Sequence, residues 1–361
     1  DDQATGVVIQ TDGKIVVTGF SVTGGNGDFA LVRLSAAGIP DAGFGTGGQV
    51  TANFGADDRA NGVALQNDGK IVLAGYTASG AGTDYAVARY NTNGSLDSNF
   101  DADGRVTTDF VASSVAFATS NATALSDGAT TNSTIPVNDS VFIADLNVTL
   151  NITHPNADEL DIVLRHVPSN ITIALVNDVA SGGANFQGTD FDDEATVGIN
   201  DPSNSAPYTG SFRPDQPLAA FDGLDAQGDW RLEVTDETGN AVSGLLNQWS
   251  LLISPATIDQ GNAIAIQSDG RIAVAGTTNS GGDNDFAIVR YNVDGSLDVS
   301  FDTDGRAVTN FGGDDRANAL DIYAITGAIV VVGTSDVGGG GIGQQVLRRA
   351  GLVDLLLARD R

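Results

Sequence analysis

The chain has 361 residues, and its 46 acidic and 17 basic side chains give a formal net charge of −29. This charge argues against partners with phosphate backbones or anionic membrane surfaces, because binding either one needs clustered Lys and Arg. Cys is absent, which excludes disulfides and thiolate metal sites. No apolar run reaches the roughly 18 residues of a transmembrane helix, so we expect neither nucleic-acid binding nor membrane insertion.

The chain also lacks Met, and therefore an initiator residue. We expect a processed product or a fragment, located outside the cell or on its surface after removal of a signal peptide. Short Val, Ile and Leu runs alternate with Gly, Asp, Asn, Ser and Thr, and Gly alone occurs 46 times. This texture is typical of an all-β protein.

From its N-terminus the chain repeats one pattern of four predicted strands. An apolar strand, an Asp-Gly turn and a second strand come first, and Asp-Gly between apolar runs predicts a tight hairpin. A third strand follows a Gly-rich loop, and a fourth ends in sequence such as GRVTTDF. Four strands in 56 residues are typical of propeller blades or of a β-solenoid. The opening phrase occurs as QTDGKIVVTGF (10–20), QNDGKIVLAGY (66–76) and QSDGRIAVAGT (267–277), and the third strand begins at Asp28, Asp84 and Asp285.

A fourth copy is incomplete. FGADDRAN at 54–61 returns as FGGDDRAN at 311–318, but the pattern breaks after the glycines at 338–341. The remaining sequence, 342–361, lacks the Asp-Phe-Ala motif with which the third strand begins at Asp28 and Asp285. It is open to three interpretations: a short amphipathic helix, an assembly segment, or residues that are not native to the protein.

The repeats resemble the delta-60 repeat family of large secreted bacterial proteins. The resemblance covers 1–110 and 258 to about 336, and both halves of the signature, DGKIV and DFALVR followed by DGSLD, recur in register. It implies an extracellular, β-propeller-like structure without known catalytic residues.

Between the second and third copies, residues 111–257 have a different texture. The long alternation of apolar and polar residues there is typical of a β-sandwich. The characteristic segments are ITHPNADELDIVL, NFQGTDFDDEA, GSFRPDQPLAAFDG, GDWRLEVTD and GLLNQWSLLI. In order and spacing, these segments resemble the P domain (P/Homo B domain) that follows the catalytic domain of subtilisin-like proprotein convertases. This resemblance implies a jelly roll that often binds calcium. Glu159 departs from the Asp usual in that family, which puts ion binding more in doubt than the fold.

The sequence therefore predicts an all-β protein with propeller-blade-like repeats and an inserted jelly-roll β-sandwich. Three repeats are full and the fourth is partial. The predicted domains are repeats 1 and 2 at 1–110, the sandwich at 111–257, and repeat 3, partial repeat 4 and an atypical tail at 258–361.

We predict no enzyme and no catalytic residues. Serine-protease chemistry needs a His base between an activated Ser and a carboxylate, and the chain has only His154 and His166. Both lie in the predicted sandwich. The Gly-Thr-Ser triplet ending at Ser335 belongs to the repeat pattern, like the equivalent stretch near Thr278.

One acidic stretch suggests a structural calcium site. Four carboxylates within five positions repel one another and raise each other's pKa unless a cation or amide donors compensate. A solvated acidic loop with Asp–backbone turns is the alternative. The candidate ligands are Asp190, Asp192, Asp193 and Glu194, with Asp178 and Asp229, and also Asp222 and Asp225, as more distant ones.

Seven Asn-x-Ser/Thr sequons are glycosylation candidates, and six of them fall within 50 residues. Chance occurrence in a Thr-rich sequence is the alternative. A glycan on any of them would require that residue to face solvent. The candidates are Asn93, Asn121, Asn132, Asn138, Asn147, Asn151 and Asn170.

Too few repeats to close a ring would leave unpaired strand edges, which pair readily with other chains. We therefore predict a secreted structural or adhesive protein that binds other copies of itself, as a filament or surface-layer subunit. One alternative is a polysaccharide-binding module using exposed Tyr208 or Phe212, with Trp230 and Trp249 in the core. The other is the accessory region of a larger secreted protease.

Overall fold

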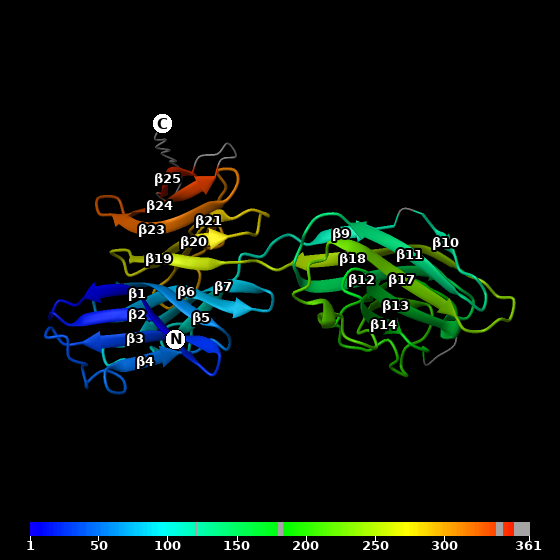
Figure 1. Ribbon diagram of the computed structural model, residues 1–361, viewed down its shortest axis with the longest axis horizontal. Helices are drawn as coiled ribbons and strands as arrows, with labels where there is room; N and C mark the ends of the chain where they lie inside the picture. Colours follow the sequence, from blue (N-terminus) through cyan, green and yellow to red (C-terminus); the bar gives the residue numbers. More distant parts are fainter. Residues whose placement is uncertain (120, 180–182, 337–341, 350–361) are drawn as a thin grey trace. The chain divides into compact units, whose positions relative to one another are not determined.

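The computed structural model describes residues 1–119, 121–179, 183–336 and 342–349. The chain divides into two compact units, residues 1–111 with 257–361 and residues 112–256, which we call the repeat unit and the sandwich unit. Both consist of small, mostly antiparallel sheets (Figure 1), so the predicted all-β class is confirmed. The described residues form only two short 3-10 turns besides, η1 (Ala157–Glu159) and η2 (Leu218–Phe221).

Three repeats each form the predicted four-stranded antiparallel sheet with strands in chain order. Positive φ angles at Gly13, Gly69 and Gly270 mark the Asp-Gly hairpin turns. The strands of repeat 1 are β1 (Asp2–Ile9), β2 (Ile15–Thr23), β3 (Asn26–Leu34) and β4 (Gln49–Ala52); those of repeat 2 are β5 (Asp58–Leu65), β6 (Ile71–Ser79), β7 (Gly82–Tyr90) and β8 (Arg105–Thr108); those of repeat 3 are β19 (Gln260–Ile266), β20 (Ile272–Thr278), β21 (Asp285–Tyr291) and β22 (Arg306–Thr309).

Repeat 4 continues further than its sequence signature. It has three strands, β23 (Asp315–Tyr323), β24 (Ala328–Asp336) and β25 (Ile342–Arg349). β25 pairs with β24 from Ile342 opposite Asp336 to Arg349 opposite Ile329, where a third strand belongs. A helix at 342–349 is therefore wrong, because backbone pairing makes a strand without the Asp-Phe-Ala sequence. Residues 350–361 lie outside the described part.

Consecutive repeats share their cores. Side chains alternate between the faces of a strand, so Leu73 and Ala88 pack against repeat 1, while Val72 and Val87 pack against repeat 3. A third cluster joins repeats 3 and 4. None of the core clusters found among the described residues joins repeat 4 to repeat 1, so the repeat unit is a row of stacked sheets.

A β-bulge explains the glycine that recurs in the second strand of every repeat. The pairing of β5 with β6 shifts register between Ala60 and Gly62. The shift brings the Arg59 carbonyl oxygen over Gly75, where a Cβ atom would lie only 1.9 Å from it. Only Gly leaves room for the bulge. The equivalent glycines are Gly19, Gly276 and Gly333, each with a backbone oxygen within 1.9 Å of the Cβ position.

The sandwich unit contains two sheets around one core. Trp230 and Trp249 are buried, and their indole N–H groups donate to Ala226 O and Ser133 Oγ; the prediction that both belong to the core is confirmed. One sheet comprises β9 (Val115–Ala118), β10 (Thr123–Ala124), β18 (Leu245–Pro255), β12 (Ile143–Thr153), β15 (Phe186–Phe191) and β16 (Tyr208–Phe212); the other comprises β11 (Thr130–Val137), β17 (Gly228–Asp236), β13 (Leu160–His166) and β14 (Ile171–Val176).

The bulge gives a first prediction. Gly75→Ala should lower the free energy of unfolding of the repeat unit by about 2 kcal/mol or more, because the new methyl group collides with backbone rather than with a movable side chain. Gly43→Ala is the matched control, since its Cβ would meet only the Asp41 carboxylate at 3.4 Å. Urea unfolding of both variants measures the difference. Equal stability of the two variants would contradict the role assigned to Gly75.

Candidate functional site

The carboxylates of the predicted calcium site lie on the sandwich unit. Asp190 is the last polar residue of β15, and the turn that follows this strand carries Asp192, Asp193 and Glu194. Burial raises the pKa of Asp145 on β12, and the charges of Asp192, Asp193 and Asp190 raise it further. Burial likewise raises the pKa of Asp222, with contributions from Asp145 and Asp193. We call this group the acidic face: Asp145, Asp190, Asp192, Asp193, Glu194 and Asp222.

Amide and hydroxyl donors compensate part of this charge. Both carboxylate oxygens of Asp193 accept backbone N–H groups at the start of η2, from Leu218 at 3.0 Å and Ala219 at 2.8 Å. Asp190 Oδ1 accepts the Thr149 hydroxyl at 3.1 Å. Burial nevertheless raises the pKa of Asp190. The acidic face therefore combines Asp–backbone turns with carboxylates that still repel one another. No three of these carboxylates have oxygens within 4.8 Å of one another; among the described residues, the groups that do meet this distance are His154 with Glu159 and Asp236, and Asp84 with Asp109 and Asp259.

Three of the more distant candidate ligands have contacts elsewhere. The Asp178 amide donates to Asp161 Oδ1. Asp225 accepts the Ser140 hydroxyl and the Val141 amide. Asp229 is on β17 of the other sheet, opposite Pro136. Of the more distant candidates, only Asp222 joins the acidic face. Asp145, which was not predicted, also belongs to it. No local motif indicated Asp145, because the pairing of β12 with β15 brings it there.

Neither histidine forms a serine-protease relay. His154 Nε2 lies 3.2 Å from Asp236 Oδ2, but its Nδ1 lies 2.8 Å from the Asn156 carbonyl oxygen. His166 Nδ1 lies 2.9 Å from Ser169 Oγ, and its Nε2 faces the Gln227 carbonyl rather than a carboxylate. In each case a backbone carbonyl takes the place of one triad side chain: the serine for His154 and the carboxylate for His166. Both histidines are buried and form hydrogen bonds within the sandwich unit.

The recurring charged residues of the repeats are structural. Arg89 is buried on β7, where its Nε donates to Asp97 at 2.8 Å and its guanidinium carbon lies 4.7 Å from the centre of the Phe100 ring. Its Nη1 donates to the Val293 carbonyl of the next repeat. Arg33 with Asp41 and Phe44, and Arg290 with Asp298 and Phe301, repeat this arrangement.

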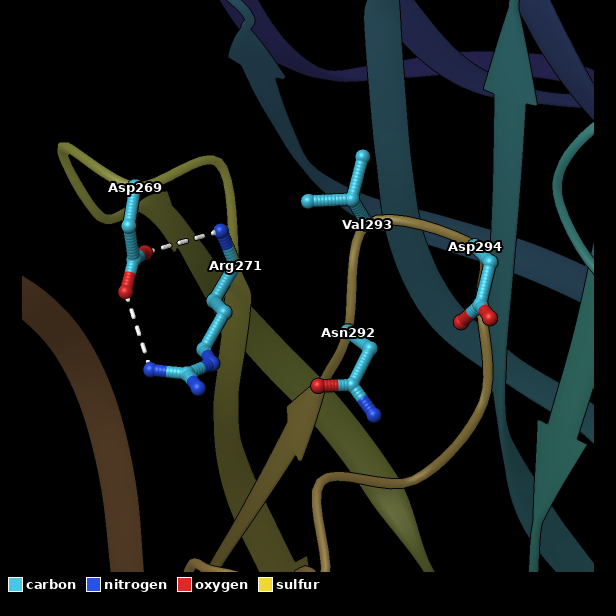
Figure 2. A pocket seen from close by; sticks show the side chains of 5 residues that line it. All are labelled: Asp269, Arg271, Asn292, Val293 and Asp294. Carbon is cyan, nitrogen blue, oxygen red and sulfur yellow. Dashed lines mark hydrogen bonds and ion pairs between the residues drawn. The ribbon is translucent and has the colours of Figure 1, made fainter.

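A hollow of about 380 Å³ opens between two turns of repeat 3. Figure 2 shows Asp269 and Arg271 on one side of it and Asn292, Val293 and Asp294 on the other. The Arg271 guanidinium pairs with Asp269 at 2.9 Å and with Asp298 at 3.1 Å. Its charge is therefore already neutralised, and the hollow has no unpaired cation to offer an anionic ligand.

The aromatic residues expected to stack on sugars do not form an exposed platform. Tyr208 is only 1% exposed, and its ring stacks on Phe186 with 5.2 Å between centroids. Phe212 is half-buried and packs edge-on against Tyr208. The prediction of exposed Tyr208 was wrong, because β16 pairs with β15 and turns this side chain into the core.

The sequons differ in accessibility. Asn147 and Asn151 are half-buried on β12 between β15 and β18, and Asn151 Oδ1 accepts the Gly188 amide. Asn93 accepts Ser95 in a turn. The exposed candidates are Asn93, Asn121, Asn132, Asn138 and Asn170.

Comparison with protein families identifies both modules. The model for a domain of unknown function (DUF5122), described as a beta-propeller, matches residues 10–44, 66–100 and 267–301. The proprotein convertase P-domain model matches residues 143–253. The chain thus consists of DUF5122 repeats and a P-domain. The predicted repeat family and P domain are both confirmed, and neither kind of module is a catalytic domain.

Solved structures resemble the chain only distantly. A serine protease of Aeromonas sobria is 16% identical with a TM-score of 0.28, and its complex with the chaperone ORF2 gives 15% and 0.29; each match covers 66% of this chain and 36% of that one. An exo-beta-1,3-galactanase from Phanerochaete chrysosporium is 9% identical with a TM-score of 0.18, covering 70% and 68%. Comparison with curated proteins gave no match. At these TM-scores the structures carry no functional argument.

The acidic face gives a second prediction. A carboxyl group whose pKa is raised by folding stabilises the fold when protonated, and this contribution is lost as the pH rises through the folded-state pKa. Asp145→Asn should therefore raise the free energy of unfolding of the P-domain at pH 7 in EDTA, by up to about 1 kcal/mol because solvent screens such charges. The gain should shrink towards pH 4. Thermal melts across this range measure it, and a destabilised variant at pH 7 would refute the repulsion.

Proposed function

We propose that this chain is the non-catalytic accessory region of a secreted serine protease. The observation that carries the proposal is the P-domain at 143–253, with both sheets and a continuous apolar core. Proprotein convertases, after which this module is named, are proteases, whereas the chain's own histidines lack the partners of a catalytic base. Catalysis is then supplied by another domain, and the P-domain serves as its folding partner.

The other parts of the chain fit this role. The acidic face holds a structural calcium ion that offsets its mutual repulsion. The exposed sequons accept glycans where the producing cell makes them. No helix of the described residues is long and apolar enough to cross a membrane, and the DUF5122 repeats act as a scaffold.

A third prediction tests the link to a protease. An antibody against residues 112–256 should detect, in the secreted fraction of the natural source, a polypeptide that also reacts with a fluorophosphonate, a probe that labels activated serines. The purified 361-residue chain is the control and should stay unlabelled. An antibody-reactive native polypeptide that takes up no probe and carries no peptides from a Ser-His-Asp domain would refute the accessory role.

A second candidate function, head-to-tail self-association, rests on one surface. A groove of roughly 330 Å³ on repeat 1 is lined by Ala4, Val17, Ala30 and Val32, among others. The equivalents of these residues in repeat 2, 56 positions later, form the buried face that packs against repeat 1. The groove is therefore the docking face for a preceding repeat, and none of the core clusters found among the described residues fills it.

The other end of the row offers a complementary face. Val330 and Val332 of repeat 4 are the equivalents of Val72 and Ala74, which pack against repeat 3. Val332 is 39% exposed. We propose that repeat 4 of a second copy of the chain occupies the groove. Each internal junction already joins one face of this kind from the earlier repeat to one of the other kind from the next repeat.

A fourth prediction follows. Val17→Asp should lower the weight-average mass of the chain in sedimentation equilibrium at tens of micromolar, because it buries a charge in the docking face. Val299→Asp, at a position 68% exposed outside the groove, is the control and should sediment like the wild type. A wild-type chain that stays monomeric under these conditions would refute self-association.

A further inference from the structure

Two aspartates meet at every junction between repeats. One lies at or within two residues of the start of a repeat's third strand, and the other lies at the start of the following repeat's first strand or just before it. Buried acidic pairs of this kind are costly unless a proton or a cation lies between them. The pairs are Asp28 with Asp58, Asp84 with Asp259, and Asp285 with Asp315.

One oxygen of the following repeat's aspartate has the same partner at each junction. Asp259 Oδ2 accepts the backbone N–H of Phe110 at 2.7 Å, and the equivalent aspartates accept Phe54 and Phe311 at 2.6 Å. Asp259 is completely buried, and its Oδ1 has no hydrogen-bond partner. A fully buried carboxylate oxygen without a donor needs an explanation.

The junction between repeats 2 and 3 differs from the other two at two acidic positions. The residue before the phenylalanine is Asn53 or Asn310 at the sister junctions but Asp109 here, whereas the residue before the following repeat's aspartate is Asp57 or Asp314 there but Ile258 here. Carboxylate oxygens of Asp84, Asp109 and Asp259 all lie within 4.8 Å of one another. Among the described residues, no such trio of carboxylates occurs at the sister junctions.

No positive side chain compensates this trio. Among the described residues, no Lys, Arg or His forms an ion pair with any of the three aspartates. The Thr257 hydroxyl lies 2.8 Å from Asp109 Oδ1 and 3.4 Å from Asp259 Oδ2, so it adds a further oxygen ligand. Three carboxylates and a hydroxyl are the hard oxygen donors that calcium prefers.

We propose that Asp84, Asp109 and Asp259 bind a calcium ion at the junction between repeats 2 and 3. Asp84 and Asp109 precede the inserted P-domain in sequence, and Asp259 follows it. The ion would therefore join the two chain segments of the repeat unit at the point where the insertion separates them. At the sister junctions Asn53 and Asn310 take the place of Asp109, and the additional aspartates there, Asp57 and Asp314, accept the backbone N–H groups of Gly27 and Asn284 instead. We therefore expect no calcium at these junctions.

The surroundings of this trio disfavour negative charge. Burial raises the pKa of Asp259 to about 7, and the Asp109 charge adds to it, while the Thr278 hydroxyl and the Phe110 amide oppose it. Burial and the Asp109 charge also raise the pKa of Asp84. A cation between the three carboxylates would offset this repulsion.

The fifth prediction uses the full chain and calcium alone as the probe. Asp109→Asn places at this position the residue that its sister junctions have, Asn53 and Asn310. Isothermal titration calorimetry at pH 7.5 should find one calcium site fewer per chain than in the wild type, or that site weakened at least tenfold. Asp321→Asn, the same charge change at an exposed position on β23, should bind like the wild type.

Thermal melts separate ion binding from a structural role. In EDTA, Asp109→Asn should melt at or above the wild-type temperature, because it removes one of three repelling charges; in millimolar calcium the wild type should melt higher. A purely structural Asp109 would make the variant less stable in both buffers. That result, or equal calcium stoichiometry and affinity in the two proteins, would overturn the proposal.

Discussion

A four-stranded sheet in this chain has two apolar faces and cannot bury either of them within its own repeat. Leu73 and Val72 are neighbours in β6, yet one belongs to the core shared with repeat 1 and the other to the core shared with repeat 3. Burying each such side chain stabilises the fold by about 1.5–3 kcal/mol. Each repeat therefore needs a stacked neighbour in order to fold. At the two ends of the row, the outer face of the terminal repeat belongs to none of the core clusters found among the described residues.

The same constraint explains how the P-domain is accommodated. Phe110 and Asp259 are 149 residues apart, yet they form the hydrogen bond that joins residues only four apart at the sister junctions. Closing a flexible loop of that length instead of four residues would cost about 3 kcal/mol more. The insert avoids most of this cost, because Val115 at its start pairs with Ile253 near its end, so that the folded sandwich holds its own ends together.

Local signals in the sequence were enough to predict most of the fold. The Asp-Gly turns act over short distances, so they recur in each of the three full copies and could be predicted from the sequence. β25 escaped prediction because backbone pairing with β24 needs no sequence signature. Tyr208 was misplaced because its burial depends on which strand lies beside β16. The acidic face was half predicted: Asp190 to Glu194 are adjacent in sequence, whereas Asp145 arrives through strand pairing.

The acidic residues fall into two groups that the composition cannot distinguish: some have basic partners and lowered pKa values, and others have no basic partner and raised pKa values. Asp97 and Asp298 are paired with buried or half-buried arginines. Despite burial, hydrogen bonds from Asn99 and Lys70 to Asp97, and from Ser300 to Asp298, hold the pKa of each carboxyl below its usual range, and the arginine charges add to this effect. Asp259 and Asp145 have no basic partner among the described residues, and their pKa values are raised instead. A net charge of −29 is therefore no guide to cation binding by itself. The carboxylates of the acidic face and the trio Asp84, Asp109 and Asp259 have no basic partner among the described residues, and these are the two places where we propose that a cation binds.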